Sequence, residues 1–427
     1  MNICIVGAGY VGLTTAAVLA ELGATVSCVD RDEGKIESLN GGIVPIYEPG
    51  LDEMIQRNRK RGTLYFRADV SEAMEESEAI MIAVGTPSAP DGTADLIFVK
   101  SVLQTIATVL HTHKTIIMKS TVPPGTGDWA ETFLLQQGCP PDLFDVVSNP
   151  EFLREGTALY DTLHPDRMVI GTKSAAAAER VKSLYEGIET DIVVTGRAEA
   201  ELIKYGSNAF LATKISFVNE LARVCDAYGA DITKVAFGIG LDSRIGGKFL
   251  QAGIGYGGSC LPKDVNALIA AAAAKDRPFT LLGTVAAVNE SQLDAYVLKL
   301  EEHIGALDSG KRIAVWGATF KENTDDIRYS QALALMEKLA AAGCQVSAYD
   351  PLVSPPVAGV EWAATMVEAL EQADALVVAT GWKQFVEANW NEVKGALGGA
   401  VVMDGRNVLD KAAVERAGLH YIGVGRP

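Results

Sequence analysis

The chain lacks several features that would assign it to other classes of protein. None of its apolar runs reaches 18 residues, which excludes a membrane-spanning helix. Its six cysteines include no CxxC pair, so a zinc ribbon is excluded and a reducing compartment is expected. Met1 leads into the apolar run at residues 3–6 without a basic leader, and we therefore expect a cytoplasmic protein without a secretion signal.

Acidic residues outnumber basic ones, and this excess of negative charge limits the kinds of partner that the chain can bind. With a formal net charge of -17 and no local basic stripe, the chain is not expected to bind nucleic acid. Only His111 and His113 of the five histidines lie close together in sequence, and two ligands do not make a metal site. We therefore expect neither a nucleic-acid partner nor a bound metal.

The 427 residues exceed what one hydrophobic core usually holds, so we expect two or three domains. A strand, a glycine-rich turn, a helix and a second strand follow one another within residues 2–29, and this order begins a βαβ unit. Further apolar runs predict a mostly parallel sheet that extends to about residue 195. These runs cover residues 79–84, 115–118, 145–147 and 168–170.

From residue 197 to 229 the pattern is helical without interruption, which predicts a helix about 45 Å long. Such a helix joins two domains and offers a face for a homodimer. A second strand, turn, helix and strand start at residue 312, and they predict a second α/β domain. The predicted fold is α/β, with two Rossmann-like doubly wound domains joined by a central helical domain. The domains are expected at residues 1–196, 197–307 and 308–427.

A glycine motif lies between the first strand and its helix. It has the pattern GxGxxG, and backbone amides at such a helix N-terminus can hold a pyrophosphate. Asp30 ends the next strand, where a carboxylate would accept hydrogen bonds from both ribose hydroxyls and repel a 2′-phosphate. The pattern predicts NAD rather than NADP as the cofactor. The residues assigned to the cofactor here are Gly7, Gly9, Tyr10, Val11, Gly12 and Asp30.

Two further places suit ligand binding or chemistry, and each has an ordinary structural alternative. Thr86 and Thr121 follow strands of the first sheet, where loops meet ligands, but a capping role fits each hydroxyl equally well. Glu151 and Glu155 are four residues apart and would share one face of a helical turn. A solvated helix face is the alternative for this pair.

Cys260 differs from the other cysteines in its neighbours. It follows a glycine-rich segment and precedes Pro262, the expected first residue of a helix. The positive helix end and the adjacent Lys263 both favour the thiolate, whereas the other five cysteines are expected to be small hydrophobes. Lys204 and Asn208, four apart on the long helix, would hydrogen-bond one oxygen or else form an ordinary surface pair.

At these motifs the chain resembles the UDP-glucose/GDP-mannose dehydrogenase family over essentially its whole length. The motifs occur in the family's order and approximate spacing, so the family's chemistry becomes an expectation for this chain. They lie at residues 7–12, 85–87, 120–123, 149–156, 204 with 208, 257–264, 320–328 and 404–406.

The resemblance implies a role for each residue of the site. Cys260 would be the nucleophile, Lys204 and Asn208 would line the oxyanion site, and Asp264 would serve proton transfer with a water. Thr121 and Glu155 would place or activate the hydrolytic water. Arg244 would reach into the site of a partner subunit. The implied cofactor ligands also include Lys35, Thr86, Thr121, Glu155, Lys263 and Arg328, and the implied substrate ligands are Glu151, Phe152, Leu153, Lys204, Asn208, Arg244, Phe249, Gly253, Gly257, Lys321 and Arg406.

Ser259 beside Cys260, together with residues 151–156, favours the UDP-glucose branch of the family. UDP-glucose would then be oxidised to UDP-glucuronate in two hydride transfers through a thioester. Dehydrogenases of GDP-mannose or UDP-N-acetylmannosamine are alternatives within the family. A hydroxyacid dehydrogenase would have no counterpart of Cys260, and a non-catalytic NAD-sensing or scaffold protein would have little reason to keep Cys260, Lys204 and Asp264 together.

Overall fold

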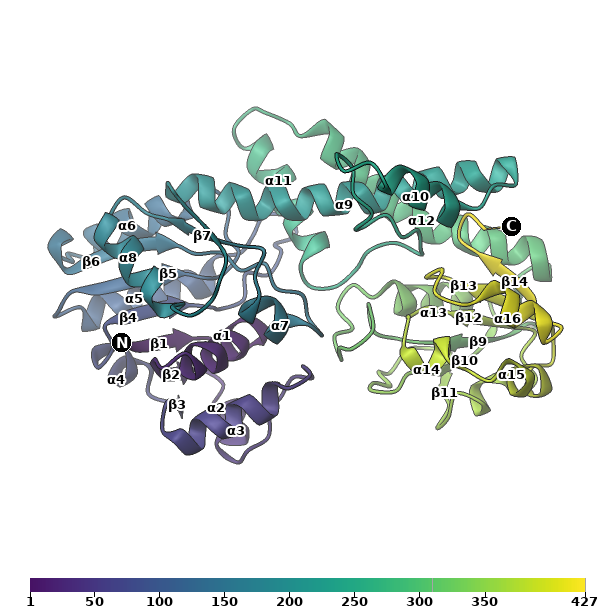
Figure 1. Cartoon of the computed structure of the whole chain (residues 1–427), viewed down its shortest axis with the longest axis horizontal. Helices are drawn as coiled ribbons and strands as arrows, with labels where there is room; N and C mark the ends of the chain where they lie inside the picture. Colours follow the sequence, from purple (N-terminus) through teal and green to yellow (C-terminus); the bar gives the residue numbers. More distant parts are fainter. Residues whose placement is uncertain (309, 427) are drawn as a thin grey trace. The chain divides into compact units, whose positions relative to one another are not determined.

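The computed structural model describes residues 1–308 and 310–426, drawn in Figure 1. Backbone contacts group the chain into two compact units, Met1–Ser207 with Asn266–Arg277 and Asn208–Val265 with Pro278–Pro427. The division into three domains remains a prediction. Within the described ranges, no helix combines the length and the apolar character that crossing a bilayer requires.

The first unit is a doubly wound α/β domain. Its eight strands lie in the order 3-2-1-4-5-6-7-8, and all neighbours are parallel except the sixth and seventh, which meet antiparallel at Ser148 and Gly171. The predicted, mostly parallel sheet is therefore confirmed. The strands are β1 (Asn2–Val6), β2 (Thr25–Val29), β3 (Leu64–Arg67), β4 (Ala79–Ile82), β5 (Lys114–Met118), β6 (Phe144–Ser148), β7 (Arg167–Gly171) and β8 (Asp191–Thr195). The helices are α1 (Tyr10–Glu21), α2 (Glu33–Asn40), α3 (Leu51–Arg61), α4 (Val70–Glu75), α5 (Ile97–Val109), α6 (Thr126–Gln136), the short 3₁₀ helix η1 (Pro141–Leu143), α7 (Ala158–Leu163) and α8 (Ala175–Leu184).

Side chains of this sheet alternate between two apolar cores. In β1, Ile3 and Ile5 pack with α1, α3 and α8, whereas Cys4 and Val6 pack with α4, α5 and α6. A period of two is expected where a parallel strand is buried on both faces. The loops at the carboxyl ends of β1, β2, β4, β5 and β6 consequently gather at one edge of the sheet, which is where ligands meet such folds.

The predicted long helix is confirmed as α9 (Arg197–Tyr228), which has 32 residues and is about 48 Å long. Both α9 and α11 contribute residues to each of the two compact units. The other helices of the middle of the chain are α10 (Ile232–Gly240), α11 (Leu261–Ala273) and α12 (Thr280–Ile304).

The second unit contains a six-stranded parallel sheet of the same type, in the strand order 11-10-9-12-13-14. Ile313 and Val315 face one apolar core, and Ala314 and Trp316 face the other. The predicted fold with two Rossmann-like sheets is therefore confirmed. The elements are β9 (Arg312–Trp316), α13 (Gln331–Ala341), β10 (Gln345–Tyr349), β11 (Val360–Trp362), the short 3₁₀ helix η2 (Glu368–Leu370), β12 (Ala375–Val378), α14 (Lys383–Val386), α15 (Trp390–Ala396), β13 (Val401–Asp404), α16 (Lys411–Arg416) and β14 (His420–Gly423).

Candidate active site

Three glycines shape the loop between β1 and α1. Gly7 has a φ of 111°, and a Cβ there would lie 2.5 Å from the carbonyl oxygen of Ala83. A Cβ on Gly12 would lie 1.8 Å from the carbonyl oxygen of Gly7, so the helix packs directly against the loop. A Cβ on Gly9 would meet no atom within 4 Å, which leaves this side of the loop open. α1 also begins without a side-chain cap or an acidic residue in its first turn, which suits an anion such as a pyrophosphate.

Asp30 lies beside this loop, immediately after β2. One carboxylate oxygen accepts hydrogen bonds from the Ala8 amide at 2.8 Å and from Lys35 Nζ at 3.2 Å, and the other accepts from the Asp32 amide at 3.0 Å. Burial acts to raise the pKa of Asp30, but these hydrogen bonds outweigh it and hold the pKa below its usual value. A charged acceptor at this place fits the ribose of a dinucleotide.

Thr86 and Thr121 are brought together at the ends of β4 and β5. The buried Thr86 hydroxyl donates to the carbonyl oxygen of Thr121 at 2.8 Å, and the Ser120 hydroxyl donates to the carbonyl oxygen of Val84 at 2.7 Å. These two bonds hold the two loops against each other.

Glu151 and Glu155 lie between β6 and α7, and the predicted turn of helix is wrong there. Residues 151–154 are not helical, and both carboxylates are buried rather than solvated. Glu151 accepts from Lys204 Nζ at 2.8 Å with one oxygen and from the Leu153 amide at 2.7 Å with the other. The bond to an amide two residues ahead stabilises a non-helical turn, and Lys204 supplies a buried positive charge.

Two residues support this segment that sequence reasoning did not identify. The guanidinium carbon of Arg167 lies 3.5 Å from the ring centroid of Phe152, and Arg167 also donates to the Ser207 hydroxyl at 3.2 Å. The buried Glu48 accepts from the Gly156 amide at 2.7 Å. Glu48 and Gly156 are 108 residues apart, so no local pattern points to their contact.

Cys260 immediately precedes α11, and its carbonyl oxygen accepts from the Asp264 amide at 2.9 Å. The predicted position of the thiol at a helix N-terminus is confirmed, although the helix begins one residue before Pro262. All six cysteines lie in the described part of the chain, and Cys260 is half-buried whereas the other five are buried. Burial raises the pKa of those five thiols, to about 12 for Cys4. Of the six thiols, that of Cys260 is best placed for reaction.

Asp264 joins Asn208 to the start of α11. Its side chain is 1% exposed; one oxygen accepts from Asn208 Nδ2 and the other from Lys263 Nζ, each at 2.6 Å. Asn208 and Asp264 are 56 residues apart in sequence, so the structure brings two predicted catalytic residues into direct contact.

The glycine-rich segment before Cys260 packs closely on the loops of the second sheet. A Cβ on Gly253 would lie 2.9 Å from the carbonyl oxygen of Gly405, and one on Gly257 would lie 2.1 Å from that of Tyr329. The half-buried Arg406 guanidinium donates to three backbone carbonyls, those of Ala379, Phe320 and Gly255, at 2.8, 3.0 and 3.1 Å. Arg406 thereby ties this segment to the loops after β9 and β12.

The other predicted ligand residues of the second unit have mixed environments. Phe249 has a φ of 64°. The Arg244 side chain is 87% exposed and pairs with Asp242 at 2.6 Å. Arg328 is 57% exposed and pairs with the carboxylate two residues before it at 2.7 Å. Lys321 is half-buried, with Nζ 5.8 Å from the ring centroid of Phe320.

The predicted residues thus fall into two groups, one in each unit. Thr121, Glu151 and Lys204 line or join the ends of β5, β6 and α9 in the first unit. In the second unit, Asn208 of α9 meets Asp264, which lies in the first turn of α11 and follows Cys260 by four residues. Within residues 1–308 and 310–426, no three His, Cys, Asp or Glu side chains are arranged to hold a metal ion.

The first sheet, its glycine loop and Asp30 define an α/β protein that binds a dinucleotide on its N-terminal domain. Comparison with known families is more specific, because three models of one family match in order: the NAD binding domain at residues 1–189, the central domain at 198–291 and the UDP binding domain at 314–411. The chain belongs to the UDP-glucose/GDP-mannose dehydrogenase family, and NAD is its cofactor. The predicted resemblance and the predicted cofactor are both confirmed.

Individual proteins resemble the chain over its full length. The UDP-glucose 6-dehydrogenase TuaD of Bacillus subtilis is 44% identical, with 100% of this chain and 93% of TuaD covered. The structure of a UDP-glucose dehydrogenase from Pyrobaculum islandicum superposes with a TM-score of 0.93 at 36% identity, covering 100% and 98% of the two chains. A UDP-D-ManNAc dehydrogenase from Pyrococcus horikoshii has a TM-score of 0.89 at 28% identity, covering 100% and 99%.

Proposed function

We propose that this chain oxidises UDP-glucose to UDP-glucuronate, with water and two NAD consumed and two NADH formed. The observation that carries the proposal is the half-buried Cys260 at the start of α11, with Asp264 and Asn208 hydrogen-bonded one turn further on. The choice of UDP-glucose is supported by the relatives of that name, which are more similar in sequence than the UDP-D-ManNAc dehydrogenase.

Cys260 is the group that makes the second oxidation possible. The first oxidation turns the primary alcohol into an aldehyde, whose carbon cannot lose another hydride until a nucleophile has added to it. The Cys260 thiolate adds to this carbon and forms a thiohemiacetal, which the second oxidation converts into a thioester. Water then cleaves the thioester, which releases the carboxylate and returns the thiol. NAD supplies the hydride acceptor at both oxidations.

Polar side chains around the carbon stabilise charge and move protons. Lys204 and Asn208 are one turn apart on α9 and donate to the oxygen of each adduct, a role worth about 3 kcal/mol per donor. Asp264 is held by Asn208 and Lys263, and it takes the proton of the substrate hydroxyl group through a water. Thr121 and Glu155 place the water that cleaves the thioester. Cofactor and substrate are held by the residues given above for each ligand, including Arg244 from a partner subunit.

We further propose a homodimer through the second-unit part of α9. Phe210, Phe217 and Val224 are 65, 55 and 50% exposed. Their spacing of seven residues places them in one stripe along the helix. Phe237 on α10 and Leu241, the residue that follows this helix, are likewise exposed, at 68 and 70%. So many large apolar side chains on neighbouring helices are typical of a surface that another chain covers.

Substrate choice and cofactor use can be tested in one experiment. The purified protein is given UDP-glucose, UDP-N-acetylmannosamine or GDP-mannose, each with NAD or NADP. We expect UDP-glucose with NAD to be used best and to give two NADH per sugar nucleotide, because Asp30 disfavours a 2′-phosphate and Cys260 allows the second oxidation. One NADH per substrate would contradict the thioester route. A higher kcat/KM for another sugar nucleotide would contradict only the substrate.

Replacing Phe217 with glutamate should separate the subunits. The dimer would bury the carboxylates of both subunits in an apolar interface without a partner of opposite charge, and this burial costs free energy. Light scattering of the wild type should give twice the chain mass, and Phe217→Glu should give the single chain mass at the same concentration. Leu298→Glu is the control, because Leu298 is 60% exposed on α12 and lies outside the stripe. A wild type that is a fully active monomer would refute the interface.

A further inference from the structure

Glu201 is a buried carboxylate to which the proposed reaction gives no role. It lies on the first turns of α9, and the residue is 3% exposed. One oxygen accepts from the Gly125 amide at 2.6 Å, and the other accepts from the Gly127 amide and the Ser148 hydroxyl, each at 2.8 Å. Burial raises the pKa of Glu201, although these three hydrogen bonds act to lower it.

These contacts place Glu201 at the N-terminus of α6. The residue that precedes this helix is Gly125, with a φ of 94° and no side-chain cap. A serine or aspartate at the N-cap position usually supplies the acceptor for the free amides of a helix N-terminus. Here Glu201 supplies that acceptor from α9. The fit is tight, since a Cβ on Gly127 would lie 2.9 Å from the Ser148 hydroxyl and 3.0 Å from Glu201 Oε1.

The same carboxylate lies at the meeting point of three segments that carry proposed catalytic residues. Gly125 ends the loop that contains Thr121, Ser148 ends β6 just before the segment that contains Glu155, and Lys204 follows Glu201 by three residues on α9. A cavity of about 10 Å³, roughly the space that one water molecule needs, is lined by Thr121, Ser148, Glu201 and Lys204 among others.

We propose that Glu201 is a positioning residue of the active site: its carboxylate fixes the loop that carries Thr121 relative to the turn of α9 that carries Lys204. The inference rests on the proposed function, which gives Thr121 and Lys204 their roles. Without the three hydrogen bonds, Thr121 would lose its set distance from Lys204, and the water that cleaves the thioester would be poorly placed. A displacement of about 1 Å is enough to reduce a rate by about 100-fold.

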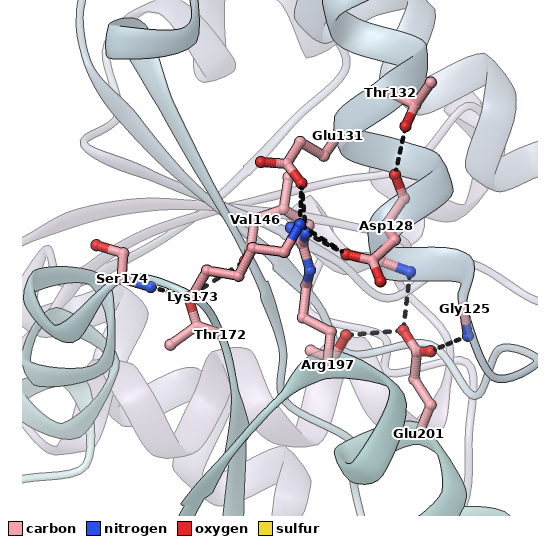
Figure 2. A network of polar contacts seen from close by, with 12 residues as sticks. Gly125, Asp128, Glu131, Thr132, Val146, Thr172, Lys173, Ser174, Arg197 and Glu201 are labelled. Atoms are coloured by element: carbon pink, nitrogen blue, oxygen red, sulfur yellow. Dashed lines mark hydrogen bonds and ion pairs between the residues drawn. The ribbon is translucent and has the colours of Figure 1, made fainter.

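The neighbouring Arg197 provides a matched control. It lies four residues before Glu201 on α9 and also contacts α6, where its guanidinium pairs with Asp128 and Glu131 (Figure 2). Lys173 pairs with the same two carboxylates, at 3.1 and 2.8 Å. Arg197 therefore joins the same two helices as Glu201. However, Arg197 contacts side chains of α6, whereas Glu201 contacts backbone amides where the preceding loop enters α6.

The test compares Glu201→Gln with Arg197→Gln, both in the full chain. In Glu201→Gln an amide NH₂ must face one of the Gly125 and Gly127 amides, so we expect kcat to fall about 10- to 100-fold. The KM for NAD should change much less than kcat, because the glycine loop and Asp30 are untouched and Thr121 is only one of the implied cofactor ligands. Intact-mass spectrometry during turnover should show more thioester on Cys260. Arg197→Gln should lower the melting temperature and keep kcat within about threefold of wild type.

Equal losses of kcat in the two variants would overturn the proposal, because they would show that the contact between α6 and α9 matters only for stability. Full activity of Glu201→Gln would overturn it as well. If Glu201→Gln does not fold, Ser148→Ala removes one of the three donors, and a fall in kcat of about fivefold, beyond the limit set for Arg197→Gln, is expected. Hydrogen exchange of residues 120–130 without substrate separates this proposal from the reaction. Faster exchange in Glu201→Gln alone supports the positioning role whatever the enzyme oxidises, and unchanged exchange overturns it.

Discussion

Cys260→Ala is expected to abolish the conversion of UDP-glucose to UDP-glucuronate, with a loss of steady-state kcat of about 10⁴-fold or more, although a first NADH can still form as the aldehyde is made. Without the thiol, the aldehyde carbon has no covalent partner, so the second hydride cannot leave by the proposed route. Binding of NAD and UDP-glucose should change little, because the substitution removes one half-buried atom at the start of α11. Steady-state kinetics and calorimetric binding measure the two effects separately.

Cys260→Ser makes this expectation more specific. The serine hydroxyl is close in shape but has a much higher pKa, so it should add slowly and form an ester that water cleaves more slowly than a thioester. Intact-mass spectrometry with UDP-glucose and NAD should then show an adduct near the mass of the sugar nucleotide on Cys260→Ser and none on Cys260→Ala. Cys225→Ala is the control, since Cys225 is buried on α9 and should be dispensable for chemistry. Two NADH per substrate at the wild-type rate from Cys260→Ala would refute the thioester route.

The parts of the fold that sequence predicts well are those whose burial follows a simple period. β1 and β2 lie within residues 2–29, and β9 and β10 belong to the unit that starts at residue 312, as predicted, because each is a strand buried within its sheet. β3, β11 and β14 were not predicted. They are three or four residues long and lie at the edges of the sheets, so they carry too few buried positions to show a pattern. β8 was also missed, and most of its side chains are exposed.

The site was predictable where a residue acts through its own neighbours in sequence. The glycine loop and the helix start after Cys260 are such cases. Contacts between distant segments were not predictable from spacing. Glu151 is an example, because its partner Lys204 lies 53 residues away. This buried ion pair is incompatible with the solvated helix face considered for Glu151. Glu48, Arg167 and Glu201 were missed for the same reason, since each supports a catalytic segment through a partner far along the chain.

Lys204→Met should lower kcat about 10³-fold and also lower the free energy of unfolding by about 3–5 kcal/mol. The two losses have different causes. Catalysis loses a donor to the adduct oxygen, whereas the fold keeps the Glu151 carboxylate, 5% exposed, without the ammonium that now lies 2.8 Å away. Adding Glu151→Gln to Lys204→Met removes the buried charge, so stability should recover in part while kcat stays low. Urea denaturation and steady-state kinetics give the two quantities.

Lys114→Met is the matched control for this pair of effects. Lys114 is as deeply buried as Lys204, but its ammonium donates to the carbonyl oxygens of Ser77 and Glu75 at 2.6 and 2.9 Å, outside the proposed site. Its loss should cost stability by leaving two buried acceptors unsatisfied, and it should leave kcat within about threefold of wild type. If Lys204→Met with Glu151→Gln regained both stability and kcat, Lys204 would only neutralise Glu151. The donor to the adduct oxygen would then have to be Asn208 alone, which is held by Asp264 at 2.6 Å.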